Sequence, residues 1–207
     1  MASRMMHLAI AALLLRQRSM GAPDRFRLGA MLPDAVVSGN SHWKLRFPDG
    51  RRTYDLRGFR QRFGELLQTD SLYLGYYMHL VQDLLFRHFV YDEHHWDPAP
   101  QGNAERLHND YALLNRYVID RYVLPPVPCL PVDLAQEPLL AGCEFDLDRF
   151  AAACQTDFIS RSDGAIFFFT PEMADSYIMC AAEQCLRELD ALQAGCSCMD
   201  QDAQAWG

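Results

Sequence analysis

The sequence predicts an all-α fold organised as a single domain over residues 1–207. Apolar residues recur at helical spacing through most of the chain, which is the pattern of packed helices. Half of the residues are apolar and 22% are charged, as in an ordinary globular domain. The chain shows no internal repeat and no Gly-rich phosphate-binding loop. A helical bundle with long irregular loops is therefore expected.

The first half of the chain holds three expected helices. The first spans Ser3–Arg18, with Ser3 as its N-cap. Residues Ser19–Tyr54 are expected to be a long loop, because Gly, Pro, Asn and Asp are frequent there. Asp55 then caps the second helix. Ser71 opens a long central helix.

The second half begins with a helix near residues 104–122. Five prolines in residues 124–142 prevent a continuous helix and predict an extended strap between two helical halves. A short helix follows at 146–156, whereas Ile166–Phe169 fits either a buried strand or the approach to the last helix. Thr170-Pro171 starts that last helix, which Gly195 ends, and residues 196–207 are expected to be a frayed tail.

Charge and targeting signals exclude several classes of protein. The net charge of −8 argues against general nucleic-acid binding, which requires clustered cations. The apolar stretch Leu72–Tyr91 contains His, Asp and Arg side chains, so a transmembrane segment is not expected. Arg16 and Arg18 stand where a signal peptide would have its cleavage site. The seven cysteines are expected to be reduced and mostly buried, which fits a cytoplasmic protein.

The most informative motif is His79-Leu-Val-Gln-Asp83 in the central helix. Residues four apart differ by about 40° around a helix, so the two side chains project together. A buried carboxylate needs a partner or a metal. Two interpretations stay open: a structural pair, either His79 with Asp83 or Asp83 with Arg87, or two ligands of one zinc ion.

An ordered set of motifs surrounds this pair. All seven histidines lie within the first 108 residues, which places the expected chemistry there. The order is Met6-His7-Leu8, then Leu28-Gly-Ala-Met-Leu-Pro-Asp34, then Ser41-His42, then Gly75-Tyr-Tyr-Met-His79-Leu-Val-Gln-Asp83. In this order the first half of the chain resembles the zinc-dependent phospholipase C family, whose superfamily also contains zinc-dependent single-strand nucleases.

The resemblance implies an all-α fold with one to three zinc ions at the bottom of a cleft. One zinc would be held by Asp34, His42, His79 and Asp83. Asp83 would bridge to a second zinc shared with His7. The family's third zinc would take its ligands from later residues, for which the candidates are His88, His108 and Asp110.

Two features of the chain depart from the family pattern. On a continuous helix His88 lies about 140° from Asp83 and points away from it. Secreted members also ligate one zinc through an N-terminal Trp, whereas Trp43 is the first Trp here. The second zinc is therefore weaker, differently ligated or absent.

The function implied by the resemblance is hydrolysis of a phosphodiester by a metal-bound hydroxide, with phospholipid among the candidate substrates. Paired zinc ions lower the pKa of bound water, with Asp34 and Asp83 as the catalytic carboxylates. The alternative is a non-catalytic helical protein that binds a metal or a partner through a partly degenerate zinc cluster. A His–Asp doublet phosphohydrolase is disfavoured, because no His is followed directly by Asp.

A basic stretch follows the expected loop. Arg51, Arg52, Arg57, Arg60 and Arg62 surround the start of the second helix. A solvated helix face is the favoured interpretation, and a patch that steers phosphate is the alternative.

Overall fold

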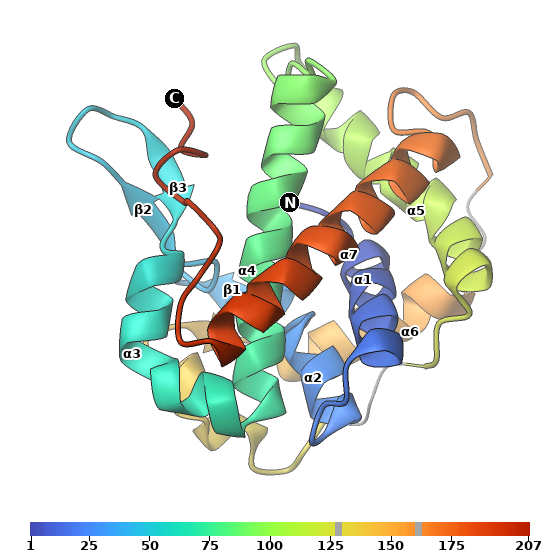
Figure 1. The fold of residues 1–207 in the computed structure, drawn as a ribbon. Helices are drawn as coiled ribbons and strands as arrows, with labels where there is room; N and C mark the ends of the chain where they lie inside the picture. Colours follow the sequence, from blue (N-terminus) through green and yellow to red (C-terminus); the bar gives the residue numbers. More distant parts are fainter. Residues whose placement is uncertain (127–129, 160–162) are drawn as a thin grey trace.

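A computed structural model describes residues 1–126, 130–159 and 163–207 of the chain. These residues are mostly helical, which confirms the predicted helical class (Figure 1). The α-helices are α1 (Arg4–Gln17), α2 (Pro23–Gly29), α3 (Leu56–Thr69), α4 (Ser71–Arg87), α5 (Asn103–Tyr122), α6 (Leu147–Ile159) and α7 (Pro171–Gln193). The strands are β1 (Val36–Ser38), β2 (Lys44–Arg46), β3 (Arg52–Tyr54) and β4 (Glu144–Phe145).

Helix α4 forms the centre of the molecule. It contacts α1, α2, α3 and α7, and α7 crosses it in Figure 1. Most of its side chains are buried on every side, including the polar His79, Gln82 and Asp83. A helix that is apolar all round belongs inside a core, and its polar residues therefore need partners there.

The predicted helix starts are confirmed by their capping hydrogen bonds. Ser3, Asp55 and Thr170 each accept a hydrogen bond from the backbone N–H three residues later. Asp70 caps α4 immediately before Ser71. These polar side chains satisfy N–H groups that have no partner within the helix.

The prediction that residues 19–54 form a loop is wrong in detail. This segment contains α2, a 3-10 helix at Leu32–Ala35, and the strands β1 to β3. The helix has seven residues and each strand has three, which is too short for apolar periodicity to be recognised. Pro23 at the first turn of α2 was the available signal.

The strands form two small antiparallel sheets. Strand β1 pairs with β4, which lies more than 100 residues later. Strands β2 and β3 form a hairpin in which Lys44 lies opposite Tyr54 and Arg46 opposite Arg52. Residues directly opposite each other share a face, so these four side chains lie on one side of the hairpin.

Within their described residues, the strap and the segment before α7 contain no long regular element. Two short 3-10 helices, Leu134–Gln136 and Pro138–Leu140, interrupt the strap. Residues 127–129, including Cys129, lie outside the described residues. Residues 166–169 form neither a helix nor a strand.

The C-terminal residues are packed, in contrast to the expected frayed tail. The Glu188 carboxylate is fully buried and accepts hydrogen bonds from Ser197 Oγ and from the backbone of Cys198 and Met199. Further on, Trp206 exchanges two backbone hydrogen bonds with Arg52 of β3. A buried carboxylate requires such donors, and satisfying it holds the tail in place.

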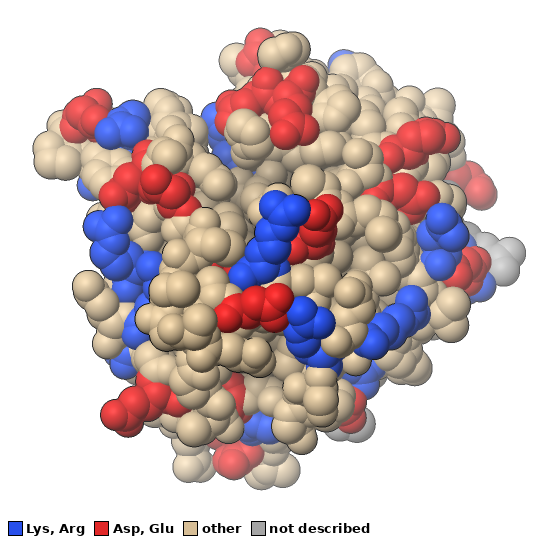
Figure 2. Space-filling model, in the orientation of Figure 1, with Lys and Arg blue, Asp and Glu red and all other residues tan. Residues whose placement is uncertain are grey.

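Figure 2 shows acidic and basic side chains interspersed over one face, with a notch between the β2–β3 hairpin and α4. Within the described ranges no helix is long and apolar enough to cross a membrane.

The described cysteines are all free, and three of them, Cys180, Cys196 and Cys198, are exposed. The prediction of mostly buried thiols is therefore only partly correct.

Candidate metal centre

Five of the predicted site residues lie together in the structure. Helix α1 supplies His7, the 3-10 helix supplies Asp34, the following loop supplies His42, and α4 supplies His79 and Asp83. All but Asp34 are buried, and the Asp34 side chain is 11% exposed. Two overlapping groups of these side chains could hold a metal ion, one of His7, His79 and Asp83 and one of Asp34, His42 and His79.

The rings of His7 and His79 are fixed by hydrogen bonds at Nδ1. His7 Nδ1 lies 2.7 Å from Oε1 of Gln82, and His79 Nδ1 lies 2.9 Å from the Ala30 carbonyl oxygen. Both partners are acceptors, so each Nδ1 carries the proton. The lone pair of each ring is therefore on Nε2, which faces the cluster.

His42 is oriented through a serine. Ser41 Oγ donates to the Pro33 carbonyl oxygen at 2.9 Å, so it can accept from His42 Nδ1 at 3.0 Å. His42 Nε2 is then the atom with the lone pair. This kind of supporting hydrogen bond is what a metal-binding histidine uses to fix its tautomer.

The distances between the acids and the imidazoles suit a metal better than hydrogen bonds. Asp83 Oδ1 lies 3.4 Å from His7 Nε2, and Asp83 Oδ2 lies 3.5 Å from His79 Nε2 and 3.6 Å from His42 Nε2. Asp34 Oδ1 lies 3.4 Å from His42 Nε2. Good N–H···O bonds are shorter, about 2.7–3.2 Å. Ligands bound at about 2.0–2.1 Å to one tetrahedral zinc lie about 3.3–3.4 Å apart.

Four buried atoms of the cluster have no hydrogen-bond partner among the described residues. They are Nε2 of His7, His42 and His79, and Oδ2 of Asp83. An unpaired buried polar atom costs about 1–3 kcal/mol, and a charged one costs more. A cation between these atoms would satisfy them together, so the donor set fits a metal ion.

The electrostatics of the cluster centre on Asp83. Burial opposes ionisation of this carboxyl, but His79 and His7 hold its pKa well below the usual range. Burial also opposes protonation of His79, yet Asp83 raises the pKa of that ring. The pKa of His7 is lowered by burial and by the neighbouring His79, whose ring centroid is 3.9 Å away. Burial also opposes ionisation of Asp34, but His42, His79 and His7 lower its pKa, so the cluster favours ionised carboxylates at both Asp83 and Asp34.

A pocket of about 410 Å³ reaches the cluster at Asp34. Among its other lining residues are Arg4, His108, Tyr111 and Asn115. The buried Tyr111 hydroxyl has no hydrogen-bond partner in the described part of the chain. Asp34 is therefore the predicted ligand that a small molecule in this pocket would meet.

Residues predicted for a third zinc are not brought into the cluster. Neither metal-holding group of the described residues includes His88, His108 or Asp110. Helix α4 gives way at His88 to a π-helical turn, Glu93 being its last residue, and the His88 side chain is 50% exposed. Its ring pairs with Asp92 at 3.0 Å instead.

The other two candidates have different surroundings. The His108 side chain is exposed at the rim of the Asp34 pocket. Asp110 is fully buried, and its carboxylate accepts backbone hydrogen bonds from Phe167, Phe168 and Phe169 at 2.8–2.9 Å. Both of its oxygens are thus occupied in holding the segment before α7.

Sequence reasoning missed the supporting groups of the cluster. Gln82 and Ser41 stand next to predicted residues, which was a usable signal for both. Nothing in the sequence pointed to the Ala30 carbonyl. The backbone N–H of Ala2, which donates to Asp83 Oδ1 at 3.1 Å, was equally invisible.

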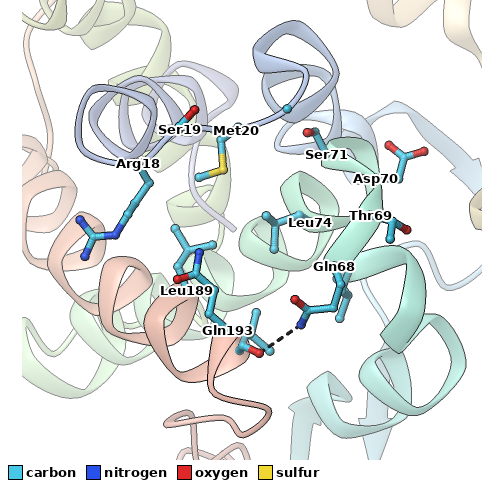
Figure 3. A pocket seen from close by; sticks show the side chains of 13 residues that line it. Arg18, Ser19, Met20, Gln68, Thr69, Asp70, Ser71, Leu74, Leu189 and Gln193 are labelled. Atoms are coloured by element: carbon cyan, nitrogen blue, oxygen red, sulfur yellow. Dashed lines mark hydrogen bonds between the residues drawn. The ribbon is translucent and has the colours of Figure 1, made fainter.

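A second pocket lies near the far end of α1, between α1, α7 and the α3–α4 junction (Figure 3). Arg18, Gln68 and Gln193 are among its lining residues, and Gln68 donates to the Leu192 carbonyl. Arg18 lies eleven positions after His7 at the end of α1, a rise of about 16 Å. This pocket therefore does not belong to the His/Asp cluster.

Comparison of the chain with protein-family models, curated proteins and solved structures finds no match.

Proposed function

We propose that this protein is a zinc-dependent phosphodiester hydrolase of the phospholipase C type. The observation that carries the proposal is the convergence of three imidazole Nε2 lone pairs and Asp83 Oδ2, all buried and without partners among the described residues. The order of the ligands along the chain agrees with the family that the sequence resembles.

The donor set favours zinc over other common metals. Imidazole and carboxylate ligands suit Zn²⁺, whereas Mg²⁺ and Ca²⁺ prefer oxygen alone. His42, His79, Asp34 and Asp83 would complete one site, and His7 would join Asp83 in a second. The two oxygens of Asp83 face different histidines, which suits a bridging carboxylate.

The chain's own residues have distinct roles in this proposal. Bound zinc would act as a Lewis acid towards phosphate oxygens. It would also lower the pKa of water, so that a water molecule can lose a proton at neutral pH and become a nucleophile. Ser41, Gln82 and the Ala30 carbonyl keep the three imidazoles oriented. Asp34, which lines the pocket, would accept a proton from water near the substrate.

One observation favours the alternative, a metal-binding protein without catalytic activity. His88, His108 and Asp110 do not join the cluster, so a three-metal centre lacks its ligands in the described residues. A cluster that holds one or two ions would then serve stability or partner binding.

The test combines metal content with turnover. Protein purified without an affinity tag or added metal is analysed for transition metals and assayed with a chromogenic phosphodiester. We expect at least about one zinc per chain and metal-dependent hydrolysis. Asp83→Asn should lose both, because it removes the shared charge.

His88→Ala is the matched control and should retain zinc and activity, since its ring is exposed and paired with Asp92. Intact zinc and turnover in Asp83→Asn, with loss of both in His88→Ala, would refute the assignment of the site. Bound zinc without turnover on lipid, nucleotide and small phosphodiesters would favour the non-catalytic alternative.

A further inference from the structure

A separate pocket of about 470 Å³ lies between the β2–β3 hairpin and the end of α4. This is the region of the notch in Figure 2. Its cations are Lys44 of β2, Arg52 of β3 and Arg87 of α4, and its aromatic walls include Tyr91 and Trp206. We name it the cationic pocket.

The charge of this pocket is opposite to that of the protein. The chain carries a net charge of −8, and Lys44 is its single lysine. Three basic side chains line the pocket, no Asp or Glu side chain is among its lining residues in the described part of the chain, and the main chain of Gly207, the last residue of the sequence, also lines it. Cations gathered from three elements around one hollow produce a local positive potential, which attracts anions.

The three cations are not neutralised equally. Arg87 Nη1 pairs with Asp92 at 3.1 Å, and the Asp92 side chain is 52% exposed. Arg52 Nη2 makes one long contact, 3.4 Å, with the Gly207 backbone oxygen. Within the described ranges Lys44 forms no ion pair. The ammonium of Lys44 and most guanidinium N–H groups of Arg52 thus remain available to an anion.

The pocket is held in shape by the backbone and by stacking. Arg52 exchanges two backbone hydrogen bonds with Trp206, at 2.7 and 2.9 Å. The Arg87 guanidinium lies over the rings of Tyr91 and Trp206, 4.0 and 5.5 Å from their centroids. Stacking preorganises the Arg87 guanidinium, which therefore loses less conformational entropy when it binds an anion.

The cationic pocket adjoins the candidate metal centre. Arg87 follows Asp83 by one turn of α4, a rise of about 6 Å on the same face. Met1 lines both this pocket and the pocket that reaches Asp34. A substrate held at the metal centre could therefore extend into the cationic pocket.

We infer that the cationic pocket binds a phosphate group, and that the substrate carries this phosphate in addition to the diester at the metal centre. Phosphate accepts several charge-assisted hydrogen bonds, which Lys44, Arg52 and Arg87 can donate. That this phosphate belongs to a substrate rests on the proposed hydrolase function, whereas the binding of phosphate in the pocket does not. A neutral or zwitterionic diester would leave the cations unused.

The first experiment measures binding of inorganic phosphate to the full-length protein by isothermal titration calorimetry. The double variant Lys44→Gln/Arg52→Gln should bind phosphate about tenfold more weakly than the wild type, because two charged donors are lost. Both residues are exposed, so the variant should fold, which a thermal melt verifies.

Two further variants sharpen this test. Arg51→Gln removes one charge from the same hairpin, but Arg51 pairs with Asp49 and does not line the pocket. Its affinity for phosphate should stay within about twofold of the wild type. Asp83→Asn separates the two sites, since it should lose metal while retaining phosphate binding.

The second experiment compares hydrolysis of a simple chromogenic diester with that of a diester bearing a further phosphate. The double variant should lower kcat/KM about tenfold for the second substrate only. Unchanged phosphate binding in the double variant, or binding lost only in Asp83→Asn, would overturn the inference. Absence of hydrolysis in every variant would refute the proposed function but leave the phosphate titration decisive for the pocket.

Discussion

Gly29 of α2 and Gly75 of α4 lie where these two helices touch backbone to backbone. A methyl group on Gly29 would overlap with the Leu72 carbonyl oxygen of α4. A methyl group on Gly75 would overlap with the Phe26 carbonyl oxygen of α2. Only glycine fits at both positions, and the close approach brings the two helices into their observed register.

This crossing also orients a ligand of the candidate metal centre. Ala30, next to Gly29, accepts the hydrogen bond of His79 Nδ1. His79 follows Gly75 by one turn on the same face of α4. Separating the helices would therefore turn the His79 ring as well as loosen the core.

Because the two helices cross so closely, a single added methyl group should lower the free energy of unfolding by an unusually large amount. Gly75→Ala should lower the free energy of unfolding by about 2–3 kcal/mol, because the overlap is with backbone that cannot move alone. Gly64→Ala in α3 is the control, since no atom lies within 4 Å of the added carbon. It should be neutral or stabilising by up to about 1 kcal/mol. Urea denaturation measures both, and equal effects would contradict the close crossing.

The serine behind His42 should control metal affinity without touching the metal. Ser41→Ala removes the acceptor of His42 Nδ1, so the ring loses its fixed tautomer. We expect zinc affinity to fall about 10–100-fold in a competition titration with a chelator. Ser38→Ala removes an exposed hydroxyl of β1 and should leave the affinity unchanged. Equal affinities for both variants would exclude a supporting role for Ser41.

Zinc should stabilise the folded protein. At a free zinc concentration about 100 times Kd the folded state gains about 2.7 kcal/mol, which raises Tm by roughly 5–10 °C. Differential scanning calorimetry with zinc and with a chelator measures this shift. The shift should vanish in Asp83→Asn, and an equal shift in that variant would place the zinc elsewhere.

The lowered pKa of Asp70 should make part of the free energy of unfolding depend on pH. Burial opposes its charge, but Arg25 and the Leu72 N–H lower its pKa in the folded state below 3.8. A lowered folded-state pKa contributes stability above the unfolded pKa, which is lost as pH falls through the folded pKa. Asp70→Asn keeps a helix cap but loses the charge, so it should cost about 1–2 kcal/mol at pH 7.

The test is denaturant unfolding from pH 7 down to pH 3. The difference between the wild type and Asp70→Asn should shrink as the acid limit is reached. Asp49→Asn, at an exposed carboxylate on the hairpin tip, should show a much smaller cost, because solvent screens its ion pair with Arg51. A difference for Asp70→Asn that grows in acid would mean that the folded state raises the pKa of Asp70 instead of lowering it.

Asp110 should matter for stability and not for metal. Its carboxylate accepts three backbone N–H groups of residues 167–169, so Asp110→Asn replaces an acceptor with a donor at a buried site. The expected cost is about 3 kcal/mol in chemical denaturation. Zinc per folded chain should stay unchanged. Loss of zinc at unchanged stability would make Asp110 a metal ligand after all.

The helices were predictable where local chemistry decides them. Ser3, Asp55 and Thr170 are capping residues whose role depends only on their own neighbours. Helix α2 was missed because packing against α4 through Gly29 stabilises it, which no local pattern reveals. The packed tail was missed for the same reason, since Glu188 acts on residues beyond the end of its own helix.

The candidate site, too, was predictable only where local geometry decides it. His79 and Asp83 are juxtaposed by helical spacing alone, whereas the approach of His7 and His42 requires the tertiary fold. The position of His88 depends on a π-helical turn that the local sequence does not indicate. Backbone groups such as the Ala30 carbonyl carry no residue identity, so their part in the site could not be inferred.

The burial of α4 on every side has a consequence for hydrogen exchange. Its amide hydrogens have no solvent-facing row through which small local openings could admit water. The amides around His79 and Asp83 should thus exchange only when the whole molecule unfolds, whereas the half-exposed α5 opens locally. The slowest-exchanging amides of the protein would then mark its polar cluster, and the rate at which they exchange would report the global free energy of unfolding.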